Sequence, residues 1–135
     1  MENLKDKAID IKGKDYILVK DRVLYFNEEY KDGSITTELL SSPDSEKIVI
    51  KATVKPDVKS DRVFTGHSQA LVGDGYINKT AALENAETSA VGRALGLMGI
   101  GVIESIASAD EMVKAGPKIY NKGYAEEVAK SNSRL

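Results

Sequence analysis

The sequence predicts an α+β fold: a curved antiparallel sheet of about five strands, packed by one long helix of small residues. Three observations predict this class. Several short runs alternate apolar and polar residues, as half-buried strands do. The three longest runs follow one another and are separated by turn residues, which is typical of an antiparallel meander. The longest helical pattern comes after them, so strands and helices are segregated along the chain.

Two short strands and one helix are predicted first. AIDIK (8–12) and DYILV (15–19) alternate apolar and polar residues. The stretch RVLYFNEEY (22–30) has helical spacing, with Asp21 placed to cap its N-terminus and Gly33 placed to end it.

The meander is predicted from three runs. They are SITTELLS (34–41), KIVIKATVK (47–55) and RVFTGHSQALV (62–72), and turns at Pro43 and Pro56 separate them. In the central run Ile48 and Ile50 face inward, so Lys51 and Lys55 face outward.

Two helices complete the predicted order. The long one covers about residues 79–98, and a capping box from Ser108 to Glu111 begins a shorter one. At 135 residues the chain fits one domain. We expect residues 1–115 to form it and residues 116–135 to be a partly mobile tail.

Composition excludes several classes of protein. There is no cysteine, and His67 is the one histidine, so thiolate or multi-histidine metal sites and cysteine nucleophiles are excluded. No phosphate-binding loop or acidic cluster at metal spacing is present, so we expect no enzyme activity, no metal and no cofactor. The charged N-terminus and the lack of a long apolar run predict a cytoplasmic protein without a membrane partner.

The long helix raises a question, because residues 84–101, ENAETSAVGRALGLMGIG, contain four glycines. A glycine within a helix costs roughly 1 kcal/mol relative to alanine. Two explanations stay open: close approach of a second subunit or ligand backbone, or accommodation of a loop. Glu87 falls among the apolar positions, and we expect a buried carboxylate held by a structural ion pair.

The stretches KDRVLYFNEEYKDGSITTELL and INKTAALENAETSAVGRALGLMGIGV carry a family resemblance. With the alternating runs between them, they resemble phage single-stranded-DNA-binding proteins of the lactococcal type. The layout is also distantly similar to the Sak-type and Erf-type single-strand annealing proteins. The resemblance covers about residues 8–113. It implies an OB-like variant or an annealing-protein-like fold, and it implies DNA binding in phage replication or recombination.

The resemblance also implies particular DNA contacts. Arg22 and Arg93 match positions at which annealing proteins contact the DNA backbone. The other basic residues of that pattern are replaced by Gly92 and Gly96, so the basic set is incomplete.

Sequence-independent binding of single strands needs cations for the phosphates and aromatic faces for the bases. Lysines, arginines and two aromatic residues on the predicted sheet and the helix starts meet this need. The predicted DNA-binding residues are Lys20, Arg22, Lys51, Lys55, Arg62, Phe64, Tyr76, Lys79 and Arg93.

The predicted function is therefore sequence-independent binding of single-stranded DNA, in the bacterial host cytoplasm during phage infection. The alternative is a strand-annealing protein that assembles rings or filaments. A purely protein-interacting subunit is a further hypothesis. We expect a homo-oligomer, a dimer or larger, and phage or host recombination proteins as further partners.

Overall fold

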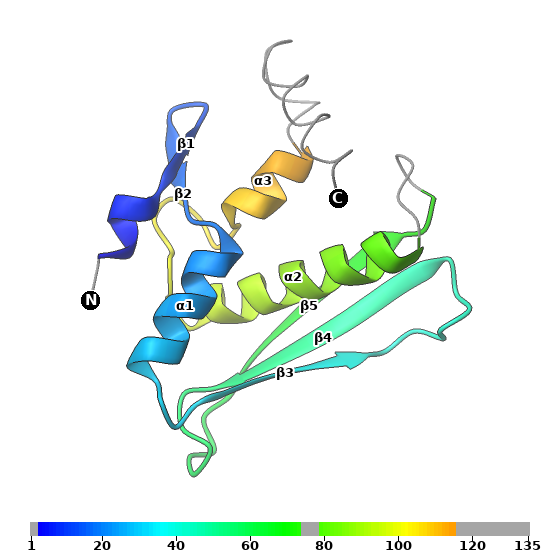
Figure 1. Ribbon diagram of the computed structural model, residues 1–135, viewed down its shortest axis with the longest axis horizontal. Coiled ribbons are helices and arrows are strands. Elements are labelled where there is room, and N and C mark those ends of the chain that lie inside the picture. The colour runs from blue at the N-terminus through cyan, green and yellow to red at the C-terminus, as the bar shows by residue number, and fades with distance from the viewer. Residues whose placement is uncertain (1–2, 74–78, 116–135) are drawn as a thin grey trace.

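The computed structural model describes residues 3–73 and 79–115. A 3-10 helix, five strands and three α-helices follow one another in these residues (Figure 1). In chain order they are η1 (Leu4–Lys7), β1 (Ile9–Ile11), β2 (Lys14–Tyr16), α1 (Val19–Glu29), β3 (Ser34–Leu39), β4 (Lys47–Lys55), β5 (Phe64–Leu71), α2 (Lys79–Leu97) and α3 (Ala109–Ala115).

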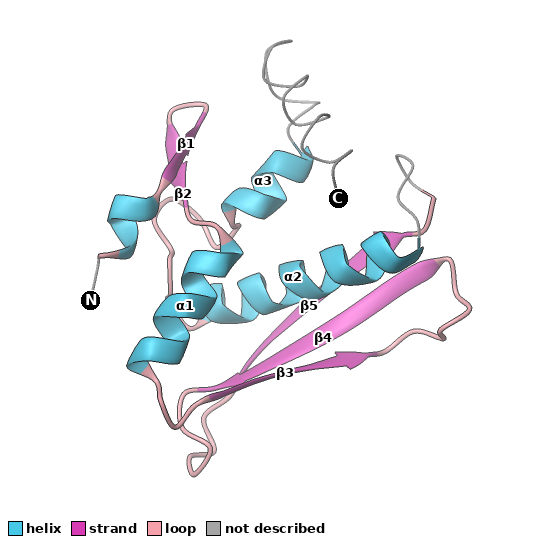
Figure 2. Cartoon of the chain, viewed as in Figure 1, coloured by secondary structure: helices cyan, strands magenta, loops and turns pink. Residues whose placement is uncertain are grey.

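The strands form two antiparallel sheets (Figure 2). β3, β4 and β5 make a three-stranded sheet with β4 in the middle, while β1 and β2 form a separate hairpin. The α+β class is confirmed, but the prediction of a single sheet of about five strands is wrong. The hairpin buries Ile11 and Tyr16 against Ala109 of α3, so its apolar side is already covered by a helix.

The main core lies between the three-stranded sheet and α2. Alternate residues of β4 are buried, and α2 covers them with a row of alanines. These alanines bring the helix so close that a Cβ on Gly66 of β5 would overlap the carbonyl oxygen of Ala90. The buried residues at this contact are Ile48, Ile50, Ala52, Val54, Ala82, Ala86, Ala90 and Ala94.

Helix α1 packs across α2 (Figure 1), and its Phe26 joins the core that α2 forms with the sheet. A Cβ on Gly92 would lie 2.5 Å from Val19 Cγ2, and one on Gly96 would lie 2.8 Å from Arg22 Nη1 and 2.9 Å from Ile106 Cγ2. The glycines of α2 therefore make room for α1 and for the loop before α3. The explanation by a loop thus holds for Gly96, which faces Ile106, whereas Gly92 makes room for Val19 of another helix.

The helix starts agree with the sequence in one case and differ in another. The capping box is confirmed: Ser108 N–H donates to Glu111 Oε2 at 3.0 Å, and Glu111 N–H donates to Ser108 Oγ at 3.2 Å. Asp21, however, lies inside α1 and is not its cap. The Val19 N–H at the start of α1 instead donates to Asp110 Oδ1 at 2.7 Å, so α3 caps α1.

Glu87 also differs from expectation. It is exposed rather than buried, and it accepts a hydrogen bond from Thr37 Oγ1 of β3 at 2.7 Å. Glu87 lies on the flank of α2 that faces β3, which is the edge of the sheet, so its carboxylate reaches solvent.

Candidate nucleic-acid interface

No helix in the described part of the chain covers the sheet face opposite α2 (Figure 2). We call this face the lysine face. Its side chains are those that alternate with the buried ones, and they meet in rows across the three strands. The lysine face consists of Ser34, Thr36 and Glu38 of β3, Lys47, Val49, Lys51, Thr53 and Lys55 of β4, and Thr65, His67, Gln69 and Leu71 of β5.

Three lysines run along the central strand of this face. Lys47 is exposed, and Lys51 and Lys55 are partly exposed. Because the three are spaced four residues apart on one strand, neighbouring ones lie about 13 Å from each other. Glu38, opposite Lys51, is the single acidic residue of the face. The net charge of the face is therefore positive.

Polar side chains surround the lysines. Thr36, Thr53 and Thr65 form one row across the three strands, and Lys51 lies beside His67 in the next row. Hydroxyl, imidazole and ammonium groups can all donate hydrogen bonds to phosphate oxygens. The face is thus rich in groups that can donate hydrogen bonds to phosphates.

The predicted site residues Lys51 and Lys55 are brought together on this face, whereas Phe64 is not. Phe64 lies on the opposite side of the sheet, packed against the core, and Arg62 stacks over its ring at 5.0 Å from the centroid. Among the described residues, the lysine face carries no aromatic side chain.

The other predicted residues lie elsewhere. Lys20 is exposed on α1, and Lys79 begins α2. Arg93, on the flank of α2 next to Gly66, is 46% exposed and forms an ion pair with Glu111 at 3.6 Å. Tyr76 lies outside the described residues.

Arg22 is not on the surface, which corrects its predicted place in the site. Its side chain is fully buried. Nη1 donates to the carbonyl oxygens of Gly92 at 2.9 Å and Ile106 at 3.1 Å, and Nη2 donates to those of Gly101 and Ala107, both at 3.3 Å. The guanidinium therefore joins α1, α2 and the loop before α3 instead of reaching a ligand.

The charge of this buried guanidinium has an electrostatic cost. Burial lowers the pKa of Arg22 below its usual value, and the nearby carboxylates of Glu111 and Asp110 partly oppose that shift. The Nε atom is buried without a hydrogen-bond partner among the described residues.

Sequence reasoning missed several members of the lysine face: Lys47, His67 and the threonine row. The signal was present, because strict alternation along β4 places Lys47 on the side of Lys51. Which β5 residues join them depends on the strand register, and the sequence left that open.

Within the described residues, no group of three or more His, Cys, Asp or Glu could hold a metal ion. None of the helices there is long and apolar enough to span a bilayer.

Comparison with known families gives one match. The chain matches the family described as Slr1353 N-terminal dsRNA-binding domain-like over residues 23–98, which is more than half of its length. The chain belongs to this family. The match runs from within α1 to just past the end of α2, so it covers most of α1, the three-stranded sheet and α2. No curated protein and no solved structure matches the chain.

The family description places the chain among domains of the nucleic-acid-binding kind. It speaks of double-stranded RNA and not of single-stranded DNA. The comparisons contain no phage single-strand binder or annealing protein, so that more specific resemblance stays a prediction.

Proposed function

We propose that this chain binds nucleic acid through its phosphate backbone, without reading base sequence, and that the lysine face is the binding surface. The observation that carries the proposal is the row of three lysines on a sheet face that no described helix covers. Cations along an open surface attract phosphates of any sequence and release their counterions.

Single-stranded DNA is the ligand that we propose first. An open, shallow face can follow a flexible single strand. Because the lysine face has no aromatic side chain among the described residues, phosphate contacts supply most of the binding. Base stacking, which the sequence suggested for Phe64, has a smaller part, since Phe64 packs against the core. The biological setting that we propose is phage DNA replication or recombination, with strand annealing as the alternative role.

Double-stranded RNA is the second candidate, and the family description favours it. Proteins recognise duplex RNA mostly by shape, through phosphates and 2′-hydroxyls, and the threonine row offers hydroxyl partners for both. The two ligands differ in rigidity and in the 2′-hydroxyl, so direct competition between them separates the candidates.

The test is fluorescence anisotropy across a salt series with three labelled ligands: a poly-dT oligonucleotide, duplex DNA and duplex RNA. We expect tight binding of poly-dT at low salt that weakens as salt increases. In the Lys51→Ala/Lys55→Ala variant, the slope of log K against log salt should become shallower by about 0.7 for each phosphate that the protein no longer neutralises.

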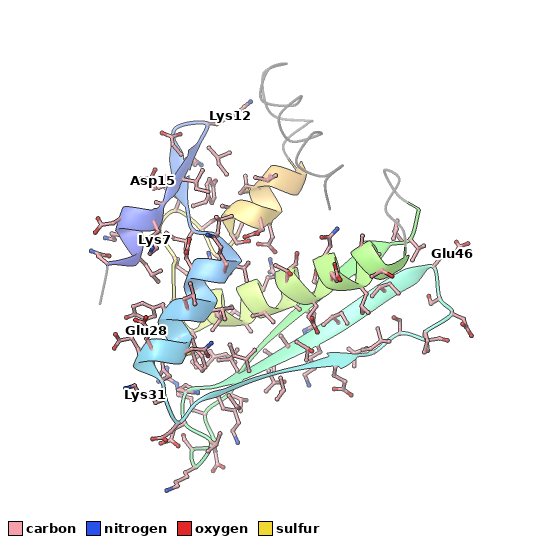
Figure 3. The ribbon with its side chains drawn as sticks, viewed as in Figure 1. Lys7, Lys12, Asp15, Glu28, Lys31 and Glu46 are labelled. Atoms are coloured by element: carbon pink, nitrogen blue, oxygen red, sulfur yellow. The ribbon has the colours of Figure 1, made fainter. Side chains whose placement is uncertain are left out.

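The matched control is Lys5→Ala/Lys14→Ala, which removes the same charge from η1 and the hairpin. Figure 3 shows the neighbouring hairpin residues Lys12 and Asp15 on the other side of α1 from the sheet. The control should keep the slope of the wild-type protein. Tighter binding of duplex RNA than of poly-dT would instead favour double-stranded RNA as the ligand. Absence of binding to all three ligands at low salt would refute the proposal.

A further inference from the structure

The two outer strands of the main sheet are unprotected edges in the described part of the chain. β3 and β5 each pair with β4 on one side only. Soluble proteins usually guard such edges with lysines, prolines, bulges or very short strands. β3 has six residues with one charge, Glu38, and β5 has eight with none besides His67, and neither contains proline. Both edges are therefore competent to pair with another strand.

The two edges carry opposite charges at the same level of the sheet. Thr37, Ala52 and Gly66 form one row on the side that faces α2. At the β3 end of this row, Glu87 accepts the hydrogen bond of Thr37. At the β5 end, the Cβ of Arg93 lies against Gly66, and the half-exposed guanidinium of Arg93 pairs with Glu111 of α3 at 3.6 Å. One row thus ends beside a carboxylate on the β3 flank of α2 and beside an arginine on its β5 flank.

The neighbouring row on the lysine face repeats this arrangement. It runs from Glu38 through Lys51 to His67. A carboxylate again lies at the β3 edge, and an imidazole that can donate a hydrogen bond lies at the β5 edge. The complementarity therefore holds on both faces of the sheet.

We propose that the β5 edge of one copy binds the β3 edge of the next copy, so that the protein assembles head to tail. Continuing the rows across the junction brings the half-exposed Arg93 of one copy, which pairs with Glu111 in its own chain, toward Glu87 of its neighbour. The same continuation brings His67 toward Glu38. Pairing two β3 edges would bring carboxylates together, and pairing two β5 edges would bring Arg93 against itself. Like charges at an interface disfavour both symmetric arrangements.

The topology sets the geometry of this junction. β3 and β5 are both antiparallel to β4, so they run in the same direction, and a head-to-tail junction pairs them in parallel. Such an interface is heterologous, and it generates a ring if the rotation closes and a filament if it does not.

An apolar groove lies beside the β3 edge, to which the β5 edge of the neighbouring copy would bind. It has a volume of about 820 Å³ and lies between α1, β3 and α2, with Val23, Leu24, Ile35 and Val91 in its lining. Leu24 is 58% exposed there. The β5 strand of the neighbouring copy would bury this surface with its helix-facing side. Burial of apolar surface would then stabilise the junction together with the backbone hydrogen bonds.

The test uses charge reversal and light scattering of the full chain without nucleic acid, so its outcome is independent of the binding proposal. We expect the wild-type protein to have a mass above that of a monomer. Glu87→Arg and Arg93→Glu should each raise the apparent dissociation constant by about tenfold or more, because each places like charges at every junction. Asp15→Arg, the same reversal on the hairpin away from both edges of the main sheet, is the matched control and should assemble as the wild-type protein does.

The decisive step is to mix the two reversed variants. In the mixture the arginine introduced at position 87 of one variant meets the glutamate introduced at position 93 of the other. The native pair forms at the alternate junctions, so the assembly should return. A variant that had failed to fold could not be rescued in this way. A wild-type monomer at all concentrations, a mixture that stays monomeric, or a closed dimer lost only in Glu87→Arg would overturn the head-to-tail proposal.

Discussion

Arg22 shows at the residue scale why a basic residue can be assigned to the wrong role from the sequence. Its place at the start of a helix suggested a phosphate contact, yet it is fully buried and its guanidinium donates to four backbone carbonyls. Nothing local distinguishes the two roles, because the carbonyls that it meets lie 70–85 residues away along the chain. Only the tertiary packing of α1 on α2 could reveal them.

The buried role of Arg22 predicts a loss of stability on substitution. Arg22→Met leaves several buried carbonyls without a donor and should lower the free energy of unfolding by about 3 kcal/mol. Arg22→Lys should also destabilise the protein, because one ammonium group cannot span the positions that the planar guanidinium reaches. Urea denaturation measures both changes.

Lys20→Ala is the control for this prediction, because Lys20 is exposed on the same helix. It should change the free energy of unfolding by no more than about 0.5 kcal/mol. An Arg22→Met protein that keeps wild-type stability but loses nucleic-acid binding would instead place Arg22 in the interface.

At the scale of elements, the periodic segments were predictable and their partners were not. The three alternating runs become β3, β4 and β5, and the long helix and the capping box lie where the sequence places them. The start of α1 was missed because its cap, Asp110, lies 91 residues away. The separate hairpin was missed because two three-residue strands carry no signal that tells which sheet they join.

The contact between α1 and α2 predicts an unusual effect of Gly92→Ala. Within a helix this change normally stabilises by roughly 1 kcal/mol. Here the added Cβ would meet Val19 Cγ2 at 2.5 Å, so the two helices must separate and the free energy of unfolding should fall by about 1–3 kcal/mol.

Shortening the neighbour tests this cause. In a double-mutant cycle, Val19→Ala should recover part of the loss caused by Gly92→Ala, with a coupling of about 0.5 kcal/mol or more. Gly99→Ala is the contrasting variant, since a Cβ there meets nothing within 4 Å and the strain comes from its φ of +97°. Additive effects in the first pair would show that the contact with Val19 is not the reason for this glycine.

At the scale of the whole molecule, the proposed surface and the proposed junction lie on one sheet. Head-to-tail pairing would extend the sheet from copy to copy and keep every lysine face on the same side, since the rows continue across each junction. The lysine faces of successive copies, each a weak site alone, would thus form one continuous binding surface, which we call the continuous track. The sequence predicted the lysines and a homo-oligomer, but not this relation, because it depends on which strands lie at the edges.

A continuous track predicts that affinity depends on the length of the nucleic acid. An oligonucleotide that spans two copies binds the second site within one complex, so its affinity should exceed that of an oligonucleotide confined to one copy by about 10²-fold or more. Glu87→Arg should abolish this gain while leaving the affinity for the short oligonucleotide unchanged, because Glu87 lies off the lysine face. Anisotropy titrations with a series of poly-dT lengths measure the effect.

Equal affinity for all lengths in the wild-type protein would show that copies bind independently, even if they associate. A length dependence that survives in Glu87→Arg would mean that the nucleic acid itself brings the copies together.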